Sequence, residues 1–272
     1  MSPRWEAPDP YPALGPIALW RWPLVVVKGV PLLALVFGGL LVLLILRQIE
    51  RPIWGQHRPW TPHITKFVCR NALRIMGIRL ELAGSLMPHH GALVANHSSW
   101  LDIFVLNACA RVYFVSKAEV AGWAGIGWLA KATGTVFIRR ERKDARAQRE
   151  LLSQRLDHGH KLLFFPEGTS TDGRRVLPFK STLFEALFAV EAEDLWVQPV
   201  TLSYHAPVGQ DPRFYGWWGD MDFAPHLIWL LSHARQGKVV VRLHDALAVA
   251  EQAGRKELAQ RSGDAVAGGL SL

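Results

Sequence analysis

From residue 78 onward, short apolar runs alternate with longer stretches in which apolar residues recur every three or four positions. Short apolar runs between turn signals are typical of buried strands, and the wider spacing is typical of helices packed on one face. The pattern predicts strands at residues 78–83, 91–95, 112–116, 135–138, 161–165, 196–204 and 238–243. It predicts helices at residues 101–110, 123–133, 142–157, 181–190, 225–235 and 255–261. Such alternation favours an α/β fold with a central mixed, largely parallel sheet flanked by helices.

An apolar segment of 23 residues, 24–46, precedes this region and holds a single charge, Lys28, which is expected to snorkel toward the interface. As a helix it would be about 35 Å long, against about 30 Å for the hydrocarbon core of a bilayer. Tryptophans and arginines flank both ends, as in an interfacial belt. The segment is therefore predicted to anchor the chain in a membrane. Pro31, Gly38 and Gly39 leave room for a kink or a broken helical hairpin, so a helix pair half-buried in one leaflet is an alternative to a full span.

The anchor divides the chain. Residues 1–23 are rich in proline and are expected to be a poorly ordered lead. Residues 24–60 form the anchor and juxtamembrane segment, 61–262 the main domain and 263–272 a tail. Residues 61–76 read as a basic amphipathic helix that could lie on the bilayer. Basic residues concentrate after the anchor, so the positive-inside bias puts the main domain in the cytoplasm.

Charge and cysteine content narrow the function classes. The net charge is +8, and residues 131–161 hold nine basic and four acidic residues. A basic patch can meet nucleic acid, an anionic membrane or a phosphorylated ligand, and no nucleic-acid-binding signature accompanies this one. The two cysteines, Cys69 and Cys109, make no disulfide framework. No His/Cys or His/Glu cluster has metal-ligand spacing, so no metal is expected.

The first candidate chemistry is the run 96–102 (NHSSWLD), which follows the predicted strand 91–95. His97 would stand at a strand-to-helix turn, where α/β sheets bind ligands, and Asp102 would lie in the first turn of the helix. A carboxylate on one imidazole nitrogen fixes the tautomer and leaves the other nitrogen free to accept a proton. A helix cap with a satisfied histidine accounts for the same spacing.

Two further strand ends carry polar residues. Residues 134–140 (GTVFIRR) end in two arginines, and Arg140 is suited to a bidentate grip on phosphate. Residues 165–170 (FPEGTS) form a turn in which Glu167 could bind substrate hydroxyls and the backbone after Gly168 could hold an oxyanion. Surface arginines and a simple turn are the plain alternatives. Convergence of three strand ends on one sheet edge favours a site.

Taken together, these blocks resemble the glycerolipid acyltransferase family. Residues 96–102 match its His-four-residues-Asp block, 134–140 its second block with Arg140 as the closing arginine, 165–170 its third and 197–200 its proline-containing fourth. The similarity covers roughly residues 77–204 and is nearest to the bacterial 1-acyl-glycerol-3-phosphate acyltransferases. Arg139 departs from the family, which often has an acid there.

The resemblance implies an enzyme of phospholipid biosynthesis on the cytoplasmic side of a bacterial inner membrane. His97 would be the general base, oriented by Asp102, for attack of a lysolipid hydroxyl on an acyl thioester. Arg140, Glu167, Gly168 and Thr169 would hold the acceptor, most naturally 1-acyl-glycerol 3-phosphate. The donor would be acyl-CoA or acyl-carrier protein, and no cofactor is required.

Three alternatives stay open. The acceptor could be a phosphate-free lysolipid such as lyso-ornithine lipid. A hydrolase could use Ser98 or Ser170 as nucleophile, although the chain has no Gly-x-Ser-x-Gly elbow. A non-enzymatic membrane adaptor could use the basic patch, but this leaves the three polar strand ends unexplained.

Overall fold

The computed structural model describes residues 5–11, 14–123, 125–138, 145–188 and 194–271. Over these residues eight strands form one sheet, in the order β1-β7-β6-β2-β5-β3-β4, with the short β8 paired to β6. The strands are β1 (Arg79–Ala83), β2 (His90–Ala95), β3 (Tyr113–Lys117), β4 (Val136–Ile138), β5 (Leu162–Phe164), β6 (Leu195–His205), β7 (Lys238–Leu243) and β8 (Leu247–Ala248). Only the pairs β6–β7 and β6–β8 are antiparallel. The predicted mixed, largely parallel sheet is confirmed.

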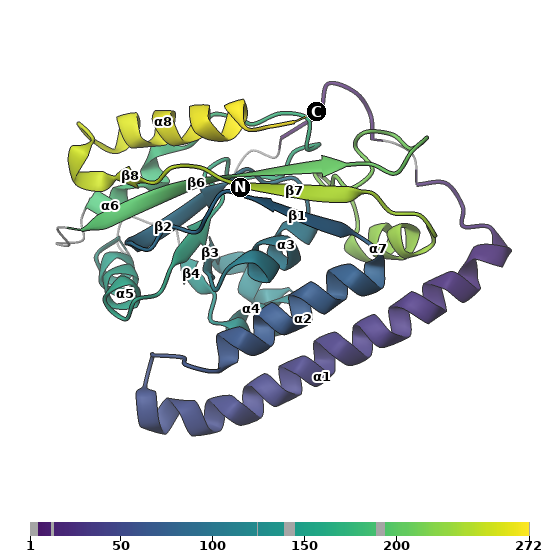
Figure 1. Cartoon of the computed structure of the whole chain (residues 1–272), viewed down its shortest axis with the longest axis horizontal. Coiled ribbons are helices and arrows are strands. Elements are labelled where there is room, and N and C mark those ends of the chain that lie inside the picture. Colours follow the sequence, from purple (N-terminus) through teal and green to yellow (C-terminus); the bar gives the residue numbers. More distant parts are fainter. Residues whose placement is uncertain (1–4, 12–13, 124, 139–144, 189–193, 272) are drawn as a thin grey trace.

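Helices cover both faces of this sheet (Figure 1). They are α1 (Trp22–Trp54), α2 (Thr61–Met76), α3 (Leu101–Cys109), α4 (Ile126–Thr133), α5 (Ala145–Asp157), α6 (Glu185–Phe188), α7 (Phe223–Leu231) and α8 (Arg255–Gly268). Side chains of β2 alternate between the two faces. Leu93 packs with α2, α3 and α7, and Val94 packs on the other side with α5 and α8. The apolar positions of β2 are thus covered by helices on both faces, as a buried strand requires.

Several element boundaries differ from the expectations. The helix expected at 123–133 begins at Ile126, because the chain first makes a 3₁₀ turn, Ala118–Gly122. The helix expected at 181–190 is a 3₁₀ turn, Ser181–Leu183, followed by the single helical turn α6. The last helix does not end at residue 261: α8 continues to Gly268, and Ser271 donates its N–H to Ser203 Oγ. Most of the expected tail is therefore packed on the sheet.

The N-terminal lead, where described, also meets the body. Trp5 and Tyr11 both make edge contacts with Trp218. Arg213 donates a 3.0 Å hydrogen bond to the Pro10 carbonyl. The lead expected to be poorly ordered thus has specific partners.

The apolar segment forms one helix, α1, which continues past Pro31 without a break and lies beside α2 (Figure 1). The two helices approach closely at Gly39, where an added Cβ would lie 2.3 Å from Val68 Cγ2. Lys28 does not snorkel: its ammonium donates to the Met76 and His233 carbonyls, at 3.1 and 2.9 Å. These carbonyls stand at the C-terminal ends of α2 and α7, where the helix dipole favours a cation. The segment therefore does not break into a hairpin at Pro31 or at Gly38 and Gly39, and α1 instead pairs with α2 along the body.

Candidate active site

The site is built at the carboxyl end of β2, which Asn96 fastens to β6. The buried Asn96 amide donates to the Leu202 carbonyl at 3.0 Å and accepts from the Leu202 N–H at 2.8 Å. Such a two-way amide bond continues the ladder past the end of the strand. His97 then turns away from the sheet with its backbone already fixed.

The His97 side chain is held by two contacts. Its ring stacks on Phe165, which follows β5, with centroids 4.1 Å apart. Nδ1 lies 2.7 Å from Asp102 Oδ2, and the side chain remains 22% exposed. Because Nδ1 is occupied by a carboxylate, Nε2 is the nitrogen available to take a proton from a substrate. The predicted His97–Asp102 pair is therefore formed, in the geometry that base catalysis needs.

Asp102 lies in the first turn of α3 and is fully buried. Besides His97, it accepts from the Ser98 and Ser99 N–H groups at 2.8 and 3.0 Å. The Tyr204 hydroxyl donates to its second oxygen, Oδ1, at 2.7 Å. Four donors on one carboxylate stabilise its negative charge and fix its orientation toward the imidazole. Tyr204 was missed from the sequence.

The Glu167 carboxylate is buried and bonded to the backbone, rather than open to a substrate hydroxyl as expected. It is 1% exposed, and its two oxygens accept from the His97 N–H at 2.7 Å and the Leu177 N–H at 2.9 Å. Burial raises the pKa of Glu167 to about 8, although the two backbone donors oppose this rise. The side chain thus joins the turn after β5 to the loop that carries His97.

The rest of the turn supports the same connection. Thr171 donates its N–H to the His97 carbonyl at 2.9 Å, so the turn bonds both polar backbone groups of His97. Gly168 has φ +72°, and an added Cβ would lie 2.8 Å from Lys180 Nζ, so a larger residue would be strained there. Thr169 is half-buried beside it. Arg139 and Arg140 lie outside the described residues.

The serine-nucleophile alternative finds no support at Ser98. Its hydroxyl is buried and has no hydrogen-bond partner among the described residues, and the bond of His97 goes to Asp102 instead. The predicted fourth block lies inside β6, where Pro199 pairs with Val94. Gln198 in that block bonds the backbone of Ser85, Met87 and His244, a structural role.

Comparison with known proteins identifies the family. Residues 79–203 match the acyltransferase family. The chain is 53% identical over 269 residues to a lyso-ornithine lipid O-acyltransferase of Rhodobacter capsulatus, covering 98% of this chain and 97% of the relative. It is 37% identical over 145 residues to a 1-acyl-sn-glycerol-3-phosphate acyltransferase of Neisseria gonorrhoeae, covering 52% and 55%.

The crystal structure of the 1-acyl-sn-glycerophosphate acyltransferase from Thermotoga maritima shares the fold. The TM-score is 0.65 at 21% identity, over 92% of this chain and 95% of that one. The fold, the sequence identity and the family match together define the class: this chain belongs to the glycerolipid acyltransferase family. It is an O-acyltransferase, and the adaptor alternative is set aside.

Proposed function

We propose that the enzyme acylates the hydroxyl of lyso-ornithine lipid. The observation that carries the proposal is the identity of 53% with a lyso-ornithine lipid O-acyltransferase over almost the whole of both chains. The relative named for 1-acyl-glycerol 3-phosphate matches about half of each chain at 37%. The acceptor first expected from the family resemblance, 1-acyl-glycerol 3-phosphate, becomes the second candidate. Its predicted phosphate ligand, Arg140, lies outside the described residues.

In the proposed reaction His97 Nε2 accepts the proton of the lysolipid hydroxyl as the oxygen attacks the thioester carbonyl. The C–S bond then breaks, and the thiolate leaves with the proton from the imidazolium. Asp102 stabilises the imidazolium through the 2.7 Å contact at Nδ1. Positioned base catalysis supplies about 10²–10⁴-fold, so orientation and oxyanion stabilisation must supply the rest. The acyl donor is acyl-CoA or acyl-carrier protein.

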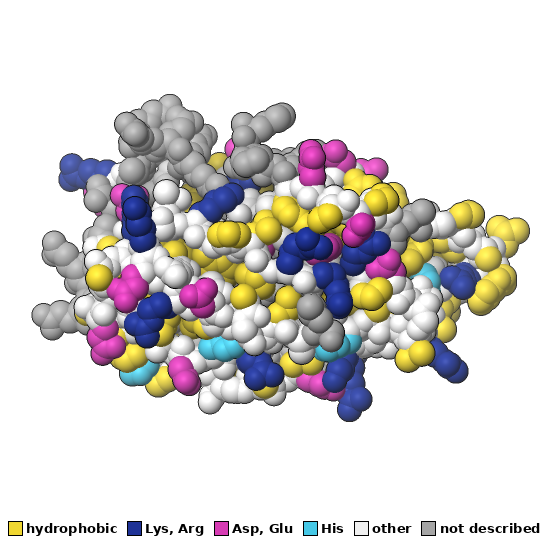
Figure 2. Space-filling model, turned by 90° about the horizontal axis from the view of Figure 1, so that it is seen from above, with side chains coloured by type: hydrophobic (Ala, Val, Ile, Leu, Met, Phe, Trp, Pro, Cys, Tyr) yellow, Lys and Arg dark blue, Asp and Glu magenta, His cyan; other side chains and the backbone are white. Residues whose placement is uncertain are grey.

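The enzyme is proposed to work on one leaflet of the membrane. Among the described residues, Leu19–Trp54 is the stretch long and apolar enough to cross a bilayer. However, α1 packs lengthwise on α2 and contacts α7, so a full span would draw the body into the hydrocarbon. Its outer side exposes large apolar residues, among them Val27, Leu33, Phe37, Leu41 and Ile49. The opposite, α8 side of the molecule shows mixed acidic and basic side chains (Figure 2). This contrast supports a helix pair embedded in one leaflet. The basic residues that follow the apolar segment favour the cytoplasmic side of the inner membrane for the catalytic domain.

A turnover assay tests the acceptor. Purified enzyme in detergent is given a radiolabelled acyl thioester and either lyso-ornithine lipid or 1-acyl-glycerol 3-phosphate. We expect acylation of the ornithine acceptor, with kcat reduced at least about 10²-fold by His97→Ala, because no base remains. Transfer to 1-acyl-glycerol 3-phosphate alone would overturn the proposed acceptor. A His97→Ala enzyme with wild-type turnover would overturn the proposed base.

A further inference from the structure

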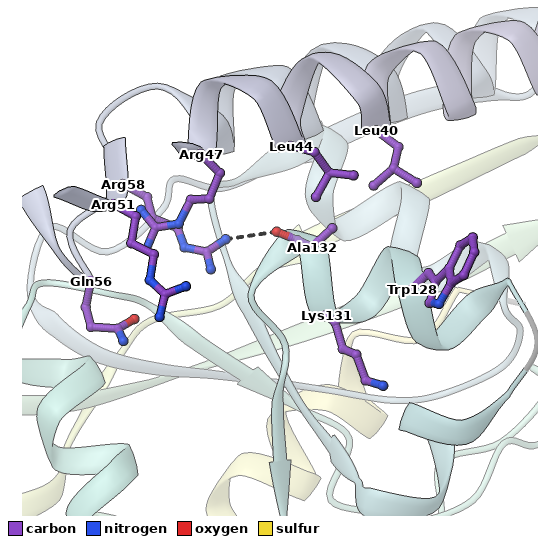
Figure 3. Close-up of a pocket in the computed structure, with 9 residues that line it drawn as sticks. All are labelled: Leu40, Leu44, Arg47, Arg51, Gln56, Arg58, Trp128, Lys131 and Ala132. Carbon is purple, nitrogen blue, oxygen red and sulfur yellow. Dashed lines mark hydrogen bonds between the residues drawn. The ribbon is translucent and has the colours of Figure 1, made fainter. Parts of the chain in front are cut away.

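A cavity of about 600 Å³ opens between the C-terminal end of α1, the following loop and α4. Four cationic side chains line it: Arg47, Arg51, Arg58 and Lys131 (Figure 3). Leu40 and Leu44 of α1 and Trp128 of α4 form its apolar side. The cavity therefore combines a cationic end with an apolar wall.

The described residues neutralise little of the positive charge of the cavity. None of the nine described residues that line it is acidic. Glu50 lies behind it, 3.6 Å from Arg47, but this buried carboxylate already accepts from the Trp60 N–H and from the Thr61 N–H and hydroxyl. The four cations of the cavity therefore have a single nearby carboxylate among the described residues, and its oxygens already accept three hydrogen bonds. The excess favours an anionic ligand.

Two of the guanidinium groups are held in place with unused donors. Arg47 Nη2 donates to the Gly55 carbonyl at 2.6 Å, and Arg58 Nη1 donates to the Ala132 carbonyl at 3.0 Å. Their buried atoms Arg47 Nη1 and Arg58 Nε have no hydrogen-bond partner within the described chain. Burial, with the nearby charge of Arg47, lowers the pKa of Arg58 to about 10. An anion bound in the cavity would offset the mutual repulsion of these guanidinium groups.

The apolar wall identifies the kind of anion. Leu44 belongs to the exposed apolar surface of α1, and Trp128 is 72% exposed. An exposed tryptophan beside arginines is typical of the level of lipid head groups. A phospholipid placed here could put its phosphate among the arginines and an acyl chain along Leu44 and Trp128. A soluble phosphate would use only the cationic end.

The cavity lies away from the catalytic pair. Lys131 and Ala132 come just before β4, whereas His97 follows the carboxyl end of β2. The pairs β2–β5, β5–β3 and β3–β4 are all parallel, so β2 and β4 point in the same direction. The cavity therefore lies at the amino-terminal ends of these strands, and His97 lies at their carboxyl-terminal ends. Its cations therefore do not contact the reacting atoms.

We propose that this cavity is a binding site for an anionic membrane phospholipid, which holds its phosphate with Arg47, Arg51, Arg58 and Lys131. The bound lipid fastens the C-terminal end of α1 and α4 to the same leaflet. The site is independent of which lysolipid the enzyme acylates.

Vesicle binding tests the site with two double variants that remove the same charge. The cavity variant, Arg51→Ala with Lys131→Ala, removes the two exposed cations of the cavity. The α2 variant, Lys66→Ala with Arg74→Ala, removes two cations from α2. Full-length protein is sedimented with phosphatidylcholine vesicles, with and without phosphatidylglycerol. Since each cation near an anionic surface contributes about 5-fold, surface attraction alone accounts for a loss of up to about 25-fold in either variant. We expect the cavity variant to lose more of the phosphatidylglycerol-dependent affinity than this, and the α2 variant no more. We also expect native mass spectrometry to show one phosphatidylglycerol retained by the wild type and by the α2 variant, but not by the cavity variant.

Other outcomes would overturn the proposal. Equal losses in both variants, with no retained lipid, would mean diffuse surface attraction. Displacement of phosphatidylglycerol by coenzyme A, with a raised KM for the thioester in the cavity variant, would assign the cations to the donor. Unchanged unfolding temperatures in detergent verify that both variants are folded.

Discussion

The hydroxyl of Tyr204, in β6, donates a 2.7 Å hydrogen bond to Oδ1 of Asp102, the carboxylate that orients His97. Both side chains are buried. Burial and the adjacent Asp102 raise the pKa of Tyr204 well above its ordinary value, so the phenol stays protonated and remains a donor. Tyr204 therefore fixes the orientation of the Asp102 carboxylate, and we propose that it positions the catalytic pair without contacting substrate.

Tyr204→Phe should lower kcat at least about 10-fold and leave KM for both substrates near the wild-type value, because a hydrogen bond to a charged group contributes about 1.5–3 kcal/mol. Steady-state kinetics in detergent gives both constants. Asp102→Asn should be more severely impaired, since its amide favours the wrong imidazole tautomer. An unfolding temperature lowered with kcat intact would assign Tyr204 a purely structural role.

Glu167 gives a second prediction, which separates positioning from substrate binding. Glu167→Ala leaves the N–H groups of His97 and Leu177 without their acceptor, at a cost of about 1–3 kcal/mol for each one that is buried. We expect a lower unfolding temperature and a lower kcat, with KM for the lysolipid unchanged. Glu167→Gln retains one acceptor and should be milder. A raised acceptor KM at an unchanged unfolding temperature would restore the original hypothesis that Glu167 binds the acceptor.

These two residues show where reading the sequence succeeds and where it fails. His97 and Asp102 are five positions apart, and a strand end followed by a helix start brings them together locally, so their pairing was predictable. Tyr204 lies 102 positions from Asp102 and meets it only because β6 pairs with β2. Glu167 was found by its motif, but its partners are backbone N–H groups, which no residue pattern specifies. The strands were predictable from apolar runs for the same local reason, whereas the β1-β7-β6-β2 order depends on long-range pairing.

Lys28 is a further case in which tertiary contacts override a local expectation. Its ammonium joins α1 to the C-terminal ends of α2 and α7 through two carbonyls. Lys28→Met keeps the apolar stem and removes both bonds, so we expect a loss of about 1–3 kcal/mol in stability. Thermal unfolding in detergent measures this loss, with Arg74→Met as the control for removing one exposed cation. If Lys28→Met were as stable as the control, the ammonium would not fasten α1.

The final prediction concerns acid sensitivity at His226, which is 1% exposed. Its Nδ1 accepts a 3.0 Å hydrogen bond from Trp100 Nε1, within the loop that carries His97. Burial lowers the pKa of His226 to about 4. Protonation at Nδ1 would also abolish the bond from Trp100.

Below about pH 6.5 His226 becomes protonated in the unfolded chain but stays neutral in the folded one. The free energy of unfolding is therefore at its full value above that pH and declines as the pH falls toward 4. One such histidine contributes at most about 1.4 kcal/mol per pH unit. Buried His160, whose pKa is lowered to about 3 chiefly by burial, adds a decline of the same sign.

His226→Gln keeps an acceptor for Trp100 and does not titrate. We therefore expect its unfolding temperature in detergent to fall less than that of the wild type between pH 7 and pH 5. His57→Gln, at an exposed ring, should keep the wild-type dependence. Equal falls in wild type and His226→Gln would show that His226 does not govern the acid sensitivity of the fold.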